Sequence, residues 1–118
     1  MSNPLDDAES LKLDLNQNIL EIGKKTKNYS DINGQYMGLL KIKSRVAKKL
    51  YSIWDNLDKQ KVYDDRSYNQ MYMTTFIQHL INIGIEVKAI PFARGWVEID
   101  SPSDITIAEN WIKNFFNT

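Results

Sequence analysis

The strongest constraint on the fold is a strand pattern that runs directly into a helix start, in residues 95–104 (GWVEIDSPSD). Trp96, Glu98 and Asp100 occupy alternate positions, so they share one face of a predicted strand. A tryptophan and two carboxylates are a costly set for one face unless that face borders a polar surface. Pro102 follows in a position typical of the first turn of a helix. A strand followed at once by a helix favours an α/β arrangement.

The rest of the chain alternates between strand and helix patterns in the same way. Leu11, Leu13 and Leu15 alternate with polar residues, and a polar turn then leads to Ile19, which predicts a hairpin. The predicted strands are 10–15, 19–22, 35–42, 85–92 and 95–100, and the predicted helices are 44–57, 70–83 and the segment from 102 onward. This order predicts an α/β domain, with a mixed sheet and flanking helices, over residues 1–118 as a single domain.

Each predicted helix carries an apolar stripe that should face the core. Ser44 is placed to cap the first helix, and Gly84 is a ready C-cap for the second. Residues 58–69 are charged and irregular, which predicts a loop. The stripes are Val46, Leu50, Ile53, Trp54 and Leu57 in the first helix, Met73, Phe76, Ile77, Leu80 and Ile81 in the second, and Ile105, Ala108, Trp111, Ile112 and Phe115 in the third.

Composition excludes several classes of function. The 118 residues contain 15 Lys and Arg against 15 Asp and Glu, which argues against binding nucleic acid or an anionic membrane through bulk charge. The chain has no cysteine, so disulfides, thiolate metal sites and a cysteine nucleophile are excluded, and a cytoplasmic location fits. No apolar run approaches about 18 residues, so no membrane span is expected. The polar, acidic N-terminus is no signal peptide and reads like a chain cut out of something longer.

A few polar residues carry candidate chemistry, and each also has a structural interpretation. Asp100 ends a strand just before a helix, where a carboxylate either holds a hard cation such as Mg²⁺ or lies near the helix N-terminus. Trp96 and Glu98 either face a polar ligand or belong to a half-buried edge strand. The lysines at 24, 25 and 27 either hold a phosphate or are solvated surface. His79, the only histidine, is expected to be structural.

Three segments, in this order, resemble a known family: 23–39 (GKKTKNYSDINGQYMGL), 71–92 (MYMTTFIQHLINIGIEVKAIPF) and 95–111 (GWVEIDSPSDITIAENW). They are similar to the C-terminal half of the sugar-phosphate nucleotidyltransferase superfamily, and most of all to its small cytidylyltransferases that act on phosphocholine or related phospho-alcohols. The third segment is the most specific, because family members carry a W-x-E-[IV]-D-[ST]-x-x-D run before a helix. The resemblance covers nearly the whole chain and implies a partial nucleotide-diphospho-sugar transferase-like fold.

The resemblance also implies a reaction and a set of site residues. Family members join a nucleoside monophosphate from an NTP, here CTP, to a phosphorylated acceptor such as phosphocholine or a sugar phosphate, with Mg²⁺ neutralising charge. By that resemblance Asp100 is one of two metal-binding carboxylates. The residues matched to acceptor binding are Lys25, Gln35, Tyr36, Trp96 and Glu98, although many relatives carry a glutamate where Gln35 stands.

The departures from the family pattern are as informative as the match. The glycine-rich nucleotide loop and the second metal-binding aspartate of the family have no counterpart here, so no catalytic residue is assigned. We therefore expect a C-terminal portion that is inactive alone and needs a missing N-terminal half. The alternative is a non-catalytic binding or oligomerisation module that forms a homodimer or docks on its missing half. A third reading, a hydrolase or lyase using Glu98 and Asp100, lacks a nucleophile and an oxyanion hole.

Overall fold

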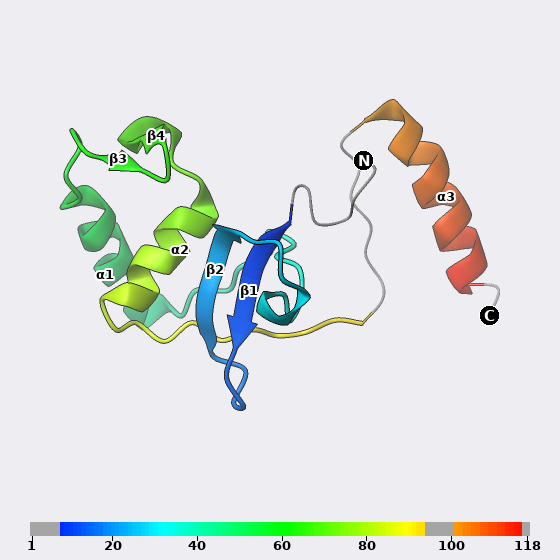
Figure 1. Ribbon diagram of the computed structural model, residues 1–118, viewed down its shortest axis with the longest axis horizontal. Coiled ribbons are helices and arrows are strands. Elements are labelled where there is room, and N and C mark those ends of the chain that lie inside the picture. The colour runs from blue at the N-terminus through cyan, green and yellow to red at the C-terminus, as the bar shows by residue number, and fades with distance from the viewer. Residues whose placement is uncertain (1–7, 94–100, 117–118) are drawn as a thin grey trace.

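The computed structural model describes residues 8–93 and 101–116, with side chains through residue 114. It is a mixed α/β structure with two small antiparallel sheets, so the predicted fold class is confirmed. Figure 1 shows the larger sheet with two of the longer helices on one side and a single, separate helix on the other. The elements are β1 (Glu9–Leu13), β2 (Ile19–Lys25), η1 (Tyr29–Asp31), α1 (Ser44–Asp55), β3 (Val62–Tyr63), β4 (Arg66–Ser67), η2 (Tyr68–Gln70), α2 (Met73–Asn82) and α3 (Pro102–Phe116).

The predicted N-terminal hairpin is confirmed as the antiparallel pair β1–β2. Its turn is closed by Asp14, whose Oδ1 accepts hydrogen bonds from the backbone N–H of Asn16 and of Asn18 at 2.8 and 2.9 Å. Gln17 adopts a left-handed conformation with φ of 68° in the same turn. The alternation predicted for β1 ends at Leu13, because Leu15 lies in the turn and is fully exposed.

Two further segments lie beside this hairpin without forming full strands. Ile32 makes a parallel bridge to Leu11, and Lys88 makes an antiparallel bridge to Asn18. Backbone hydrogen bonds from Ile19 N–H to Val87 C=O (2.7 Å) and from Ala89 N–H to Gln17 C=O (2.8 Å) support the second bridge. One bridge is parallel and the other antiparallel, but both lie outside the regular strands, so the sheet itself consists of the antiparallel strands β1 and β2.

Helix α2 packs on β2 and completes the core. Leu11, Ile22 and Ile77 form the buried cluster, and Tyr36 and Val87 pack against it. Gly84 follows α2 with φ of +94°, which confirms the expected glycine stop, because a left-handed residue after a helix favours glycine. Met73 of the predicted stripe is instead 52% exposed.

Helix α1 and the short helix η2, which follows the β3–β4 hairpin, are joined to α2 by an aromatic cluster. Trp54 stacks on Tyr68 with ring centroids 4.6 Å apart and meets Phe76 edge-on at 5.2 Å. The loop expected at 58–69 thus contains a short hairpin, whose turn residues Asp64 and Asp65 both have positive φ. Ser44 is the first residue of α1 and makes no side-chain cap; Lys43 precedes it at the N-cap.

Helix α3 begins at Pro102, as predicted. The Asp104 carboxylate accepts a hydrogen bond from the Ser101 backbone N–H at 3.0 Å, and the Asp104 N–H donates to the Ser101 C=O at 3.0 Å. This reciprocal arrangement satisfies groups that a helix start otherwise leaves free. Ala108 is buried as expected, but Ile105 and Ile112 are 48% and 44% exposed. Figure 1 shows α3 apart from α1 and α2, which explains why its wide apolar stripe is not fully covered.

Two predicted strands are wrong in the described part of the chain. Residues 35–42 form no strand, and Leu39, Leu40 and Ile42 are exposed. Residues 85–92 contribute only the bridge at Lys88. An apolar run acquires strand structure only when a neighbouring strand pairs with it, and the described residues supply none for 35–42. The predicted strand at 95–100 lies outside the described residues.

Candidate functional site

The lysine run after Gly23 is the best-defined candidate site in the described residues. Gly23 lies at a register shift between β1 and β2 and has φ of +78°. A Cβ at this position would lie 2.8 Å from the Cβ and Oγ1 of Thr74 in α2. Glycine is therefore required both by the conformation of the bulge and by the close approach of the helix. The bulge sets the direction in which the following lysines leave the sheet.

Lys24 is held by two elements of the fold. Its backbone N–H donates to the buried Ser10 hydroxyl at 3.2 Å, and its Nζ pairs with Asp64 Oδ1 at 3.2 Å. The other carboxylate oxygen, Asp64 Oδ2, accepts a hydrogen bond from the Thr75 hydroxyl at 2.8 Å. The bond from Thr75, with the Lys24 ammonium beside it, lowers the pKa of Asp64 despite partial burial. This cluster, Lys24–Asp64–Thr75, ties β2 to the β3–β4 turn and to α2.

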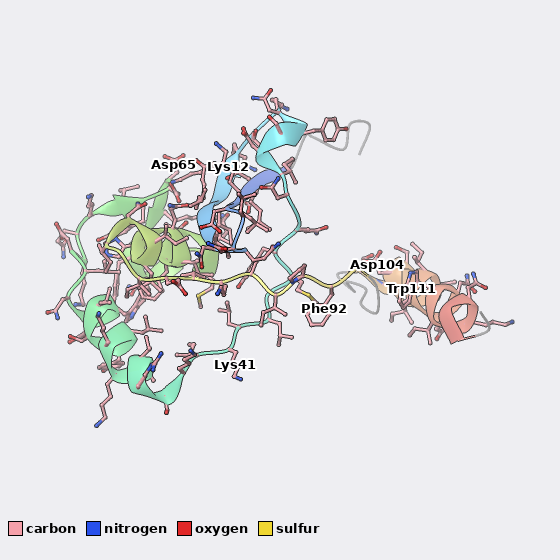
Figure 2. All side chains as sticks on the ribbon, turned by 90° about the horizontal axis from the view of Figure 1, so that it is seen from below. Lys12, Lys41, Asp65, Phe92, Asp104 and Trp111 are labelled. Carbon is pink, nitrogen blue, oxygen red and sulfur yellow. The ribbon has the colours of Figure 1, made fainter. Side chains whose placement is uncertain are left out.

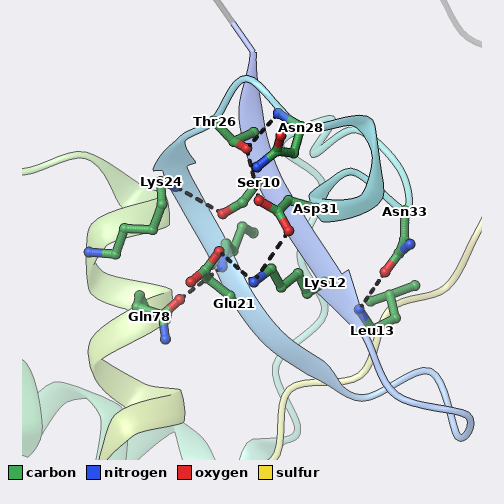
Figure 3. Close-up of polar contacts among 11 residues, drawn as sticks. Ser10, Lys12, Leu13, Glu21, Lys24, Thr26, Asn28, Asp31, Asn33 and Gln78 are labelled. Atoms are coloured by element: carbon green, nitrogen blue, oxygen red, sulfur yellow. Dashed lines mark hydrogen bonds and ion pairs between the residues drawn. The ribbon is translucent and has the colours of Figure 1, made fainter. Parts of the chain in front are cut away.

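The segment after the lysines is also fixed by hydrogen bonds (Figure 3). The Thr26 hydroxyl donates to Asp31 Oδ2 at 2.9 Å and accepts from the Asn28 N–H at 3.1 Å. Lys12 belongs to β1, and its Nζ lies 3.4 Å from Asp31 Oδ1. The hydrogen bond from Thr26 lowers the pKa of Asp31, and the charge of Lys12 acts in the same direction. The loop 26–31 is thus folded back onto the outer face of the hairpin.

Lys25 is the last residue of β2 and is exposed. Its strand position is fixed by pairing with Glu9. Among the described residues Lys25 makes no ion pair, whereas Lys24 is engaged with Asp64. An exposed ammonium at the end of a fixed strand is available to an anionic ligand such as a phosphate.

Gln35 and Tyr36 occupy different environments. Gln35 is exposed, whereas Tyr36 is half-buried against the Leu11–Ile22–Ile77 cluster. Burial raises the pKa of the Tyr36 phenol, so the ring contributes apolar surface and a neutral hydroxyl. No hydrogen bond joins Lys25, Gln35 or Tyr36 to one another within the described residues.

The other three predicted site residues, Trp96, Glu98 and Asp100, lie outside the described residues. Their grouping with Lys25 and Tyr36 therefore stays a prediction. Within residues 8–93 and 101–116, no group of three or more His, Asp or Glu side chains could hold a metal ion. The described part of the chain does not form a metal centre by itself.

No helix in this part is long and apolar enough to cross a membrane.

An open pocket of ≈ 510 Å³ lies elsewhere, between the end of α1 and α2, and includes Lys61, Tyr63 and His79. Its polar groups are partly engaged locally, since the Tyr63 hydroxyl donates to the Asp58 C=O at 2.8 Å. It contains none of the predicted site residues. His79 lies in the last turn of α2 and lines this pocket, and its expected structural role stays a prediction.

Sequence reasoning did not single out Asp64, Thr75, Ser10 or Gln78. Asp64 is 40 residues from Lys24 and 11 from Thr75, so no local pattern links them. One sequence signal could have predicted the turn that carries Asp64. Two aspartates lie between two short strand-like dipeptides, and Asp tolerates the left-handed conformation that tight hairpin turns require.

The chain is similar to the CTP:phosphoglutamine cytidylyltransferase of Campylobacter jejuni subsp. jejuni serotype O:2 (strain ATCC 700819 / NCTC 11168). The two are 39% identical over 106 residues, which cover 90% of this chain and 42% of the Campylobacter protein. The chain thus spans less than half the length of this relative. No protein-family model and no solved structure matches it. The expected similarity to a cytidylyltransferase is confirmed by this relative, whereas the wider superfamily is not.

Proposed function

We propose that this chain is the acceptor-binding portion of a Mg²⁺-dependent nucleotidyltransferase. The complete enzyme joins the CMP part of CTP to a phosphorylated acceptor and releases pyrophosphate. The observation that carries the proposal is the 39% identity to a cytidylyltransferase over 90% of this chain. The fixed lysine run at the end of β2 supports it, because the reaction requires a cation at the acceptor phosphate.

Lys25 is the residue that we assign to the acceptor phosphate. Lys24 is committed to Asp64 at 3.2 Å, and this ion pair holds the end of β2 against the β3–β4 turn. Lys25 is exposed and its backbone is held in the strand. A lysine binds phosphate as a point charge, so it needs a fixed position more than a fixed orientation. Lys24 therefore supports the position from which Lys25 acts.

The remaining acceptor contacts are assigned by resemblance. Gln35 and Tyr36 would line the acceptor pocket, and the neutral Tyr36 ring offers it an apolar edge. Trp96 and Glu98 would form the facing wall. Mg²⁺ would be held by Asp100 together with nucleotide phosphate oxygens and a second carboxylate from the nucleotide-binding part, and would neutralise phosphate charge in the reaction.

The acceptor class is a small phosphorylated metabolite. The Campylobacter relative is named for phosphoglutamine, and we include this compound beside phosphocholine and sugar 1-phosphates. All three present a phosphate dianion to Lys25, and they differ in the group that Gln35, Tyr36 and Trp96 would meet. Discrimination among them would come from those three side chains.

A second candidate function is a non-catalytic binding or oligomerisation module derived from the same fold. The observation that favours it is the number of large apolar side chains that are exposed, with Leu39 at 73% and Ile90 at 72%. Surfaces of this kind in a folded protein mark an interaction site. The two candidates differ in whether the chain itself recognises a phosphorylated ligand.

Titration of the chain separates them. The chain would be titrated by NMR with phosphoglutamine, phosphocholine and a sugar 1-phosphate, and separately with CTP and Mg²⁺. We expect one acceptor to shift the backbone amides of Lys24, Lys25 and Tyr36 while CTP leaves them unchanged. Absence of any shift at millimolar acceptor would contradict the acceptor-binding proposal and favour the module. The variant Lys48→Ala, on exposed α1, is a matched control for Lys25→Ala.

A further inference from the structure

Two segments of the chain have the residue pattern of buried strands but lie exposed. In residues 39–42 the large apolar side chains are exposed to 73% (Leu39), 43% (Leu40) and 54% (Ile42). In residues 90–92 the values are 72% for Ile90 and 58% for Phe92. Figure 2 shows the labelled side chains of Lys41 and Phe92 projecting outward from the ribbon. We call these five apolar residues the open apolar surface.

The backbone of both segments is also unpaired. Among the described residues, no backbone hydrogen bond involves 35–42 or 90–93. The second segment begins where the sheet ends, since Ala89 is the last residue bonded to the hairpin, through its N–H to Gln17 C=O at 2.8 Å. Unpaired backbone groups beside apolar side chains can pair with a strand from another segment.

Both segments directly follow residues that pack against the same buried cluster. Tyr36, three residues before Leu39, packs against the Leu11–Ile22–Ile77 cluster, and so does Val87, three residues before Ile90. Gly38, with φ of +82°, turns the first segment away from that core before the open surface begins. A partner that covers both segments would therefore extend the existing core.

We propose that the open apolar surface receives β-strands from the polypeptide that supplies the nucleotide-binding part of the enzyme. The inference rests on the proposed function and adds the contact surface. The occupant is indicated by length, because more than half of the Campylobacter relative lies outside the part that matches this chain. It is also indicated by pattern, because Leu39 and Leu40 lie on opposite faces of an extended chain, and burying both faces requires a strand inside a layered sheet. Edge pairing with a second copy would leave one of these faces exposed.

A chimera tests the inference without separating two halves of a fold. Residues of this chain would replace the matched region of the Campylobacter protein, and hydrogen exchange would be compared with that of the isolated chain. We expect the amides of 39–42 and of Ile90 and Phe92 to exchange about tenfold or more slowly in the chimera. The amide of Ile22, which is bonded to Gln78 at 2.8 Å, reports that the isolated chain is folded. Equal exchange at 39–42 in both proteins would overturn the proposal.

Two variants of the chimera sharpen the test. Leu40→Asp should lower the melting temperature and restore fast exchange at 39–42. Leu15→Asp is the matched control, because Leu15 is fully exposed in the hairpin turn. Equal effects of the two variants would count against the surface. Protection in the isolated chain that grows with its concentration would identify a second copy as the occupant and would also overturn the proposal.

The same chimera separates this inference from the proposed function. Pyrophosphate release from CTP is measured beside exchange. Protection of 39–42 without turnover would support the surface and contradict the nucleotidyltransferase proposal. Turnover without protection would contradict the surface and leave that function standing.

Discussion

Gln78 in α2 accepts a hydrogen bond from the backbone N–H of Ile22 in β2 at 2.8 Å, in a buried environment. The amide group of Gln78 is oriented by its own donation from Nε2 to Asn82 Oδ1 at 2.9 Å. The helix side chain thus replaces the neighbouring strand that would otherwise pair with this part of β2. It fixes the helix against the strand that carries Lys25, and Figure 3 shows Gln78 reaching from the helix to the strand.

Replacing Gln78 by methionine should destabilise the fold. Methionine has a similar length but no amide, so the buried Ile22 N–H would lose its acceptor, at a cost of about 1–3 kcal/mol. Urea unfolding followed by circular dichroism measures this. The matched control is Gln70→Met at an exposed position in η2, which should change the free energy of unfolding by less than about 0.5 kcal/mol. Equal losses for the two variants would mean that the hydrogen bond does not hold α2 to β2.

Replacing Gly23 by alanine should cost more stability than replacing Gly38. Both glycines have positive φ, so both alanines carry the conformational cost of about 1–2 kcal/mol. Only at Gly23 would the new Cβ also meet Thr74, at 2.8 Å, whereas nothing lies within 4 Å at Gly38. The difference in free energy of unfolding between the two variants measures the clash. A smaller loss at Gly23 than at Gly38 would contradict the close approach of α2 to the bulge.

Asp64 should contribute a stability that depends on pH. Its pKa is lowered in the folded state by the Thr75 hydrogen bond and by Lys24, so its contribution is present above the unfolded pKa near 3.8 and is lost as the pH falls through the folded pKa. Asp64→Asn should therefore be destabilising at pH 7 and nearly neutral well below the folded pKa. Asp65→Asn is the control, because asparagine tolerates positive φ at both positions. A penalty at Asp64 that does not change with pH would rule out the charged contact.

Tyr36 should titrate above the pKa near 10 that is usual for tyrosine. Burial disfavours the phenolate and raises its pKa, so stability should fall as the pH rises through this raised value. Phenolate absorbance during alkaline titration, compared between the chain and Tyr36→Phe, isolates the group. If the substitution removes a tyrosine with an ordinary pKa instead, Tyr36 does not pack against the Leu11–Ile22–Ile77 cluster.

The sequence predicted correctly those helices and strands whose apolar periodicity, turn residues or capping residues lie within or directly beside the element. The hairpin followed from alternation with a polar turn, α2 from its stripe and Gly84, and α3 from the serine and proline at its start. Residues 35–42 were wrongly predicted to form a strand. An apolar run indicates that a segment prefers burial, but it does not indicate which neighbouring strand will pair with it. Ile105 and Ile112 were expected inside for the same reason, and they are exposed where nothing described covers them.

The candidate site was predictable only in part. The lysine run was visible in the sequence, but the distinction between Lys24 and Lys25 was not, because it depends on Asp64, which the β3–β4 turn brings close. That turn was missed because two aspartates in left-handed conformation are a weaker sequence signal than Asn-Gly or Asp-Gly. Trp96, Glu98 and Asp100 stay predictions from the resemblance.

The most direct test of the central claim is the acceptor dependence of pyrophosphate release by the chimera with the Campylobacter protein. We expect Lys25→Ala to raise the KM for the phosphorylated acceptor by about 10- to 100-fold, because a charged contact to the phosphate is lost, and to leave the KM for CTP unchanged. Lys48→Ala should change neither value. A folded chimera whose acceptor KM is the same with Lys25→Ala as with Lys48→Ala would contradict the assignment of this chain as the acceptor-binding portion.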